Sequence, residues 1–386
     1  MRHDGFRLTY AFTGITNRLL VSTYRYTGLP VGVWARSYWQ RNDNMDMEFA
    51  LRRRRALVVR SHNPTRRTIE RVASYIRSIN RARETLNMDC WFSVDTTTLS
   101  PARRRNHSRA AQHPDPATDK HFCGRKRKRI ESRSACRNIA AVMRECGLEL
   151  GRDYCVHTYT EAQMIAAYPV LTEIHGHCRI RDVKEFTTGA CSLAWGMHCE
   201  ALNLWFQHAR GAAARTPARA QGAHGAGTDA YRYDECWVME DDVGWAGQDI
   251  ATELFARYCA VEADLITADA DHFDDRWWWH STHSAAYQRR VPREARRVSR
   301  EHVQRLSARL LDRLHDFAVA GCTAWSEAMT VSVCHAEPDL KLALFEASVL
   351  GNPFRYDGRM TPQRWDDIMQ GRSKRFRGKL YHALKW

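Results

Sequence analysis

Long apolar runs are missing from this sequence of 386 residues. No stretch approaches the roughly 18–20 apolar residues that a membrane-spanning helix needs. A secretory leader is missing as well, because Arg18, Arg25 and Arg36 interrupt each candidate apolar core near the N-terminus. We therefore expect a soluble chain without a transmembrane segment, or a fragment that has lost its leader, and a cytoplasmic location if no leader is missing.

Three motifs that mark large enzyme classes are also missing. The sequence contains no P-loop, no G-x-G-x-x-G and no G-x-S-x-G. Their absence disfavours a kinase, a dinucleotide-dependent oxidoreductase and a serine hydrolase. The 12 cysteines never form a C-x-x-C pair, and several of them, such as Cys90 and Cys236, lie in apolar stretches. This usage is typical of small buried hydrophobic residues rather than of a zinc finger.

Lysine is scarce, whereas arginine is abundant: only 8 of the 59 basic residues are lysine. The formal net charge is +15, and residues 101–135 contribute +8 of it, with eleven Lys or Arg against three acidic residues. Residues 124–129 resemble a polyanion-binding or nuclear-localisation run. An arginine bias also fits a GC-rich coding sequence, so the charge alone does not identify a partner.

Residues 56–386 show the alternating pattern of an α/β domain. The apolar run 56–59 predicts a buried strand, apolar steps of three and four over 65–79 predict a helix, and residues 90–94 predict a second strand. A strand, a helix and a strand in this order form a βαβ unit, which implies a parallel sheet. Residues 1–55 are interpreted as an N-terminal extension. Insertions are expected at 101–135 and 209–230, both exposed and disordered.

The same patterns predict the later elements. The clearest predicted helix spans residues 299–317, with Ser299 as its cap and one apolar stripe from Val303 to Phe317. The other predicted helices are 134–146, 161–168, 190–208 and 249–260, and the other predicted strands are 154–157 and 264–267.

The most informative segment is 233–243, where an apolar strand ends in Glu240, Asp241 and Asp242. Three adjacent carboxylates repel one another and are costly to bury unpaired. At the C-terminal end of a parallel strand they line the crevice where α/β sheets bind ligands. A divalent cation is the simplest neutraliser, and carboxylate oxygens suit Mg²⁺ or Mn²⁺. A solvated acidic turn is the alternative interpretation.

Residues 237–243 (WVMEDDV) resemble the strand and acidic D-x-D-type motif of GT-A-fold glycosyltransferases. The aromatic stretch 277–280, the Ser-Glu pair at 326–327 and the terminus 379–385 (KLYHALK) are similar to features of algal and protist members of that superfamily. The resemblance implies a GT-A-like (Rossmann-like) α/β fold, with a mostly parallel sheet flanked by helices. Glu240 stands where many relatives carry Asp, which leaves open whether Glu240 or Asp242 binds the metal.

The residues and the resemblance together indicate a set of site residues. Glu327, which lies among small and apolar neighbours, and, as the next candidate, Asp357 are expected to act as the catalytic base that takes a proton from the acceptor hydroxyl. A structural pairing of Glu327 with an arginine is the alternative. The expected metal ligands are Glu240, Asp242 and His382. The expected contacts to the nucleotide-sugar donor are Asp95, Asp241 and Lys385. The indole faces of Trp277, Trp278 and Trp279 are expected to offer an acceptor platform, although core packing of two of them is the alternative.

The function that follows is a metal-dependent glycosyltransferase (hexosyltransferase). It would use Mn²⁺ or Mg²⁺ and move a sugar from a nucleotide sugar, UDP-hexose by expectation, to a glycan or glycoprotein acceptor. The resemblance implies the Golgi or secretory lumen. Whether the anomeric configuration is retained or inverted stays open. Two alternatives remain: a nucleic-acid-binding protein that uses 101–135 and the arginine clusters, and a catalytically inactive relative of the glycosyltransferases.

Overall fold

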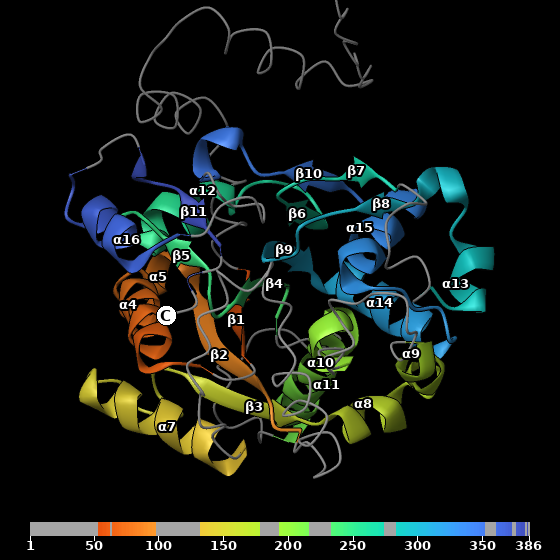
Figure 1. The fold of residues 1–386 in the computed structure, drawn as a ribbon, viewed down its shortest axis with the longest axis horizontal. Helices are drawn as coiled ribbons and strands as arrows, with labels where there is room; N and C mark the ends of the chain where they lie inside the picture. Colours follow the sequence, from red (N-terminus) through yellow and green to blue (C-terminus); the bar gives the residue numbers. More distant parts are fainter. Residues whose placement is uncertain are drawn as a thin grey trace, which may run out of the picture. The chain divides into compact units, whose positions relative to one another are not determined.

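Seven strands form one sheet at the centre of the fold (Figure 1). The computed structural model describes residues 53–61, 64–97, 132–177, 193–215, 233–273, 283–351, 360–372, 376–382 and 384. The strands of this sheet are β1 (Arg55–Ser61), β2 (Met88–Asp95), β3 (Cys155–Tyr159), β4 (Glu235–Glu240), β6 (Leu265–Thr267), β9 (Val303–Ser307) and β10 (Leu342–Leu344).

The strand order is β10-β6-β9-β4-β1-β2-β3. Strand β9 is antiparallel to both of its neighbours, whereas every other neighbouring pair is parallel. This pairing confirms the expected fold class, an α/β fold with a mostly parallel sheet. All of the described elements belong to one compact unit, Leu51–Trp386.

Helices cover both faces of the sheet (Figure 1). Because side chains alternate along a strand, Leu57 and Val59 pack into one hydrophobic cluster, and Ala56 and Val58 into the other. The first face is covered by α4 (Arg66–Arg81), α7 (Ser132–Glu145) and the continuous helical segment η2 (Ala251–Phe255) and α12 (Ala256–Tyr258). The second is covered by α11 (His198–Arg215), α14 (Ala308–Val319) and α15 (Ser326–Ala336).

The first βαβ unit forms as the sequence predicts. Thr65 caps α4, and its hydroxyl accepts a hydrogen bond from the Thr68 backbone N–H. Ile69, Val72 and Ile76 are buried on the face of α4 that packs on the sheet.

The remaining elements are α5 (Arg83–Leu86), α8 (Glu161–Ala167), α9 (Leu171–His177), α10 (Leu193–Gly196), β5 (Gly244–Trp245), β7 (Asp271–His272), α13 (Ala285–Arg290), η4 (Arg293–Ala295), β8 (Arg297–Val298), η5 (Ala347–Val349), α16 (Pro362–Met369) and β11 (Leu380–Tyr381).

The prediction of one helix over 299–317 is wrong. Strand β9 occupies its first half, and α14 begins at Ala308, with Ser307 rather than Ser299 as its cap. Pairing with β4 and β6 on both sides outweighs the local helical spacing of the apolar residues. The side chain of Arg305 is buried in this strand, and its guanidinium donates hydrogen bonds to the backbone oxygens of Tyr258, Val261 and Ala263.

Other predicted boundaries also shift. Helix α7 already begins at Ser132, inside the predicted insertion 101–135. Helix α11 continues to Arg215, inside the predicted insertion 209–230, and the helix predicted over 190–208 breaks at Met197. The rest of both insertions and residues 1–52 lie outside the described residues.

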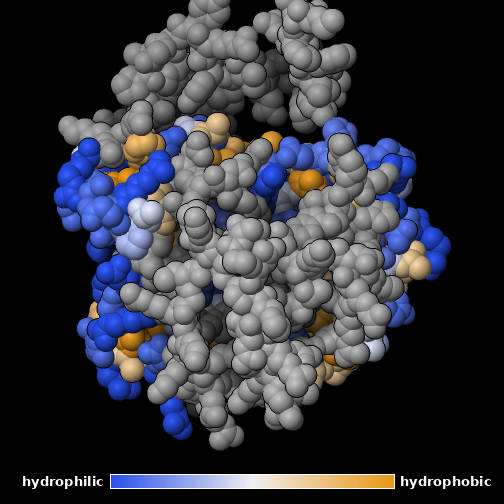
Figure 2. Space-filling model, in the orientation of Figure 1, coloured by the Kyte–Doolittle hydropathy of each residue, from blue (hydrophilic) through white to orange (hydrophobic). Residues whose placement is uncertain are grey.

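The described surface is mainly polar. Figure 2 shows hydrophilic side chains along both flanks of the coloured surface, with hydrophobic ones in small separate spots. The large apolar side chains that are most exposed, Leu150, Val319, Leu344 and Met369, come from separate parts of the chain. Within the described ranges, no helix has both the length and the apolar character needed to cross a membrane.

Candidate metal centre

The acidic corner lies where the order of the sheet reverses. The chain leaves β1 toward β2 on one side and later returns to β4 on the other side of β1. In α/β sheets, ligands bind in the crevice outside the carboxyl ends of strands at such a switch point. Here Arg60 is in register with Glu240. The Ser61 hydroxyl donates a hydrogen bond to the Asp241 carboxylate at 2.6 Å.

The C-terminal segment folds back onto this corner. Strand β11 pairs antiparallel with β5, which follows the acidic residues directly. The Leu384 backbone N–H donates to the Asp242 carbonyl at 2.8 Å. Gly244 permits this close approach, because a Cβ there would lie 2.2 Å from Leu384 Cδ1 and 2.6 Å from the Trp365 ring. As a result, His382 lies beside Glu240.

Glu240, His302 and His382 form a compact group of potential ligands. Each offers one ligand atom, and these atoms all lie within 4.8 Å of one another. The Glu240 Oε2 atom is 2.9 Å from His302 Nδ1 and 3.1 Å from His382 Nε2. The two imidazole rings are stacked, with centroids 3.4 Å apart. Asp242 Oδ1 lies 3.5 Å from His382 Nε2, so a second carboxylate borders the group.

Neighbouring groups shift the pKa values of two adjacent carboxylates in opposite directions at this corner. Burial alone would raise the pKa of Glu240, but the charge and hydrogen bond of His302, followed by those of His382, bring this pKa well below its ordinary value. Burial and the neighbouring charge of Asp242 raise the pKa of Asp241 to about 7. Asp241 thus holds its proton more tightly than an isolated aspartate does, and a nearby cation would favour its charged form.

A chain of ionisable groups leads away from Glu240. The Arg60 Nη2 atom lies 3.4 Å from Glu240 Oε1 and donates to the Glu301 carbonyl at 3.0 Å. Arg60 Nη1 lies 3.7 Å from Glu301 Oε2. The other Glu301 oxygen lies 2.5 Å from His198 Nδ1. Residues from β1, β4, α11 and the turn before β9 therefore meet at this edge of the sheet.

The structure brings several of the predicted site residues together at the acidic corner. Glu240, Asp242 and His382 lie together, and Asp241 is next to them. Asp95 ends β2, but its buried carboxylate accepts hydrogen bonds from the backbone N–H of Thr97, at 2.8 Å, and from the Thr97 hydroxyl.

Glu327 is described by the structure, whereas the remaining predicted residues are not. Glu327 lies in the first turn of α15, next to Ser326, and its carbonyl accepts a hydrogen bond from Ser299 N–H. Trp277, Trp278, Trp279, Asp357 and Lys385 lie outside the described residues.

His302 was missed by the sequence analysis. It directly precedes β9, and its carbonyl accepts a hydrogen bond from Glu240 N–H at 2.9 Å. The predicted helix over 299–317 concealed this pairing, since a residue in the first turn of a helix would not lie opposite the end of β4. A strand assignment for 303–307, together with its pairing to β4, is what places His302 beside the acidic corner.

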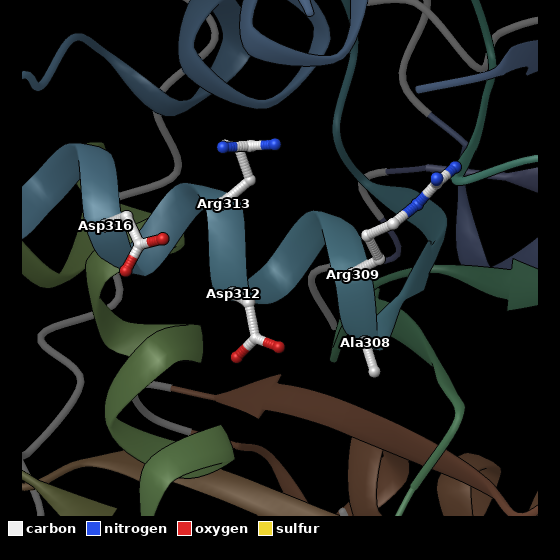
Figure 3. Close-up of a pocket in the computed structure, with 5 residues that line it drawn as sticks. All are labelled: Ala308, Arg309, Asp312, Arg313 and Asp316. Carbon is white, nitrogen blue, oxygen red and sulfur yellow. The ribbon is translucent and has the colours of Figure 1, made fainter. Parts of the chain in front are cut away.

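A surface pocket lies at the opposite end of β4. It is lined by Ala308, Arg309, Asp312, Arg313 and Asp316, all from α14 (Figure 3). Because Ser307 pairs with Glu235 at the start of β4, the beginning of α14 is far along the strand from Glu240. Arg309 pairs with Asp264 at 2.6 Å, and Asp312 with Arg210 at 2.6 Å. Two of the charged side chains that line the pocket are therefore paired with residues of other segments.

Comparison with known proteins gives similarity at the level of the fold. No protein-family model and no curated protein matches the sequence. Among solved structures, the chain is similar to the mannosyltransferase PcManGT from Pyrobaculum calidifontis in complex with GDP-Man and Mn²⁺, at 12% identity and a TM-score of 0.34. The match covers 86% of this chain and 64% of that one, less than two thirds of its length.

Two further solved structures are of the same class. The galactosyltransferase LgtC, in complex with donor and acceptor sugar analogues, has 10% identity and a TM-score of 0.33, over 85% of this chain and 86% of that one. Mouse xyloside xylosyltransferase 1 has 10% identity and a TM-score of 0.32, over 86% and 97%. All three are glycosyltransferases, the class that the sequence resemblance implies. Likenesses this distant do not themselves bear on the activity of this chain.

Proposed function

We propose that this protein is a metal-dependent glycosyltransferase that moves a sugar from a nucleotide-sugar donor to a glycan or glycoprotein acceptor. The observation that carries the proposal is the convergence of Glu240, His302 and His382 within 4.8 Å at the switch point of the sheet. A ligand group at this place can hold a cation beside a donor bound across the crevice.

The ligand atoms suit Mn²⁺ better than Mg²⁺. Mg²⁺ prefers oxygen ligands and keeps several waters, whereas imidazole nitrogens are ligands of transition metals. Glu240 and, from its border position, Asp242 would supply oxygen, and His302 and His382 would supply nitrogen. When bound, the cation would act as a Lewis acid that offsets the charge of the leaving nucleoside diphosphate.

The protein's own side chains would orient the donor around that centre. Arg60 is held by Glu240 and by the Glu301 carbonyl, so its position is set by two elements at once. Asp241, whose carboxylate accepts a hydrogen bond from the Ser61 hydroxyl, would accept hydrogen bonds from the donor. Two parts of the proposal come from the sequence. Lys385 would contact the diphosphate, and the tryptophans at 277–279 would form the acceptor platform.

The test is nucleotide release from a panel of UDP- and GDP-sugars with Mn²⁺, with Mg²⁺ and with EDTA. Mn²⁺-dependent release by the wild-type chain is expected. Glu240→Ala and Asp242→Ala should abolish this release and weaken Mn²⁺ binding in calorimetry, while the circular dichroism spectrum is kept. Glu262→Gln, an exposed carboxylate whose side chain is 78% accessible, is the matched control and should behave as wild type.

Two outcomes would contradict the proposal. Equal Mn²⁺ and UDP or GDP affinity in the wild type and both Ala variants would show that the acidic corner is not a metal site. Unchanged Mn²⁺ and nucleotide binding without turnover of any donor would instead identify the chain as a catalytically inactive relative.

A further inference from the structure

A histidine–carboxylate pair lies next to the candidate metal centre but is not part of it. His198 Nδ1 lies 2.5 Å from Glu301 Oε1, and the two side chains are 11% and 5% exposed. His198 is the first residue of α11, whereas Glu301 belongs to the turn before β9. The pair therefore joins two elements that are distant in the sequence.

The position of His198 is fixed from the α15 side. Its backbone N–H donates to the Ser326 hydroxyl at 2.5 Å, and that hydroxyl donates to the Gly196 carbonyl at 2.6 Å. A Cβ at Gly196 would lie 2.2 Å from the Trp325 ring, so the start of α15 can approach this closely only because residue 196 is glycine. The imidazole is thus held at a defined place rather than on a loose surface loop.

The arrangement also sets which ring nitrogen is available. An ionised carboxylate only accepts hydrogen bonds, so Nδ1 carries the proton in the neutral ring and Nε2 carries the lone pair. Within the described part of the chain, no residue makes a hydrogen bond to His198 Nε2. A histidine oriented by a carboxylate, with its second nitrogen available, is the arrangement of a general base.

Arg60 connects this pair to the metal centre, because it contacts both Glu301 and Glu240. We propose that His198 is the base that takes the proton of the acceptor hydroxyl, and that Glu301 is its positioning residue. This inference rests on the proposed glycosyltransferase function.

The chemical step balances as a single displacement. The acceptor oxygen forms a bond to the anomeric carbon as its proton passes to His198 Nε2. The bond from the anomeric carbon to the diphosphate oxygen breaks, and its electron pair leaves with the nucleoside diphosphate. The imidazolium then releases the proton to solvent. One displacement inverts the anomeric carbon, so the assignment of His198 also assigns an inverting outcome.

Glu327 is the competing base from the sequence. It lies in the first turn of α15, where a carboxylate commonly stabilises the helix through the helix dipole. His198 differs in that it has a dedicated carboxylate partner and a direct link through Glu301 and Arg60 to the metal centre. Among the described residues, the charged groups near the pair include Arg60 from β1 and the buried Glu200 from α11, and Glu327 follows the Ser326 that contacts His198.

The test uses the full chain with Mn²⁺ and the donor that it turns over fastest. His198→Asn keeps a donor group near Glu301 but removes the base. We expect unchanged Mn²⁺ and donor affinity, and a fall in kcat of about 10² to 10⁴-fold, the usual contribution of a general base. The low-pH limb of the wild-type rate profile should vanish, and added imidazole should partly restore the rate of His198→Ala. Glu301→Gln should displace the same limb.

His335→Asn, at an exposed position late in α15, is the control and should match the wild type in every measurement. A product with retained anomeric configuration, or a His198→Asn rate and pH profile equal to wild type, would overturn the assignment while leaving the proposed function intact. Loss of transfer in Glu327→Gln but not in His198→Asn would transfer the role to Glu327. A wild-type chain that turns over no donor would overturn both proposals.

Discussion

Glu200 shows how burial can make a single carboxylate depend on pH. It lies in α11 with 0% exposure, and it accepts a hydrogen bond from the Thr323 hydroxyl. Burial is the main cause that raises its pKa to about 7, from an ordinary value of 4.5. The folded protein therefore binds this proton more tightly than the unfolded chain does.

The sign of the pH dependence follows from linkage. Because the folded-state pKa is the higher one, the stabilising effect of the proton is complete below about 4.5 and is lost as the pH rises to about 7. Glu200→Gln mimics the protonated side chain and should remove this loss. We expect the variant to melt above the wild type at pH 8, with a smaller difference at pH 5, in scanning calorimetry at both pH values. An equal difference at both pH values would show that Glu200 is not the titrating group.

Single residues also show what the sequence could predict about the site. Glu240 and Asp242 could be predicted because three carboxylates after an apolar strand have few inexpensive environments. His382 was predicted only through the resemblance of its segment. His302 could not be predicted, because its relevance depends on which residue of β9 lies opposite the end of β4, and local periodicity carries no information about that pairing.

At the scale of elements, the close packing of β5 and β11 is the feature that brings His382 to Glu240. Gly244→Ala would push a methyl group into Leu384 and the Trp365 ring. We expect the C-terminal segment to shift, Mn²⁺ affinity to fall at least tenfold and the protein to lose about 1–3 kcal/mol of stability, the usual cost of overpacking. Calorimetric Mn²⁺ titration and urea unfolding measure the two effects.

The matched control is Gln248→Ala, an exposed position shortly after β5. It should change neither quantity. Wild-type Mn²⁺ affinity in Gly244→Ala would mean that the docking of β11 does not position a ligand.

The elements that could be predicted differ from those that could not in a physical way. Strand β1 and helix α4 follow one another and pack together, so their local patterns and their tertiary environment agree. In 299–317 the two conflict: the apolar spacing is helical, yet β4 and β6 each offer a ladder to residues of β9. Arg305, at the centre of the strand, is buried only because its guanidinium donates to backbone carbonyls about 40 residues away in the sequence. A local pattern contains no information about such partners.

At the scale of the whole molecule, the basic segment between β2 and α7 is predicted to be dispensable. Deletion of residues 103–131 should change the free energy of unfolding by less than about 1 kcal/mol, since closure entropy depends only weakly on loop length. Donor turnover should be nearly unchanged. Thermal melts and the nucleotide-release assay measure both effects.

A large loss of folded protein on this deletion would show that the segment contributes to the core. Steeply salt-dependent nucleic-acid binding by the full chain that disappears on deletion would favour the nucleic-acid-binding alternative instead.

The candidate ligands come from three separate parts of the chain, with Glu240 and His302 alone 62 positions apart. A cation held by them would act as a reversible cross-link between a central strand, its antiparallel neighbour and the C-terminal segment. Its binding free energy would add to folding by mass action, because the unfolded chain has no such site. The free concentration of the ion would then set how often the C-terminal segment detaches from the sheet, as well as the rate of turnover. Amide exchange along β11 would slow as the ion concentration rises.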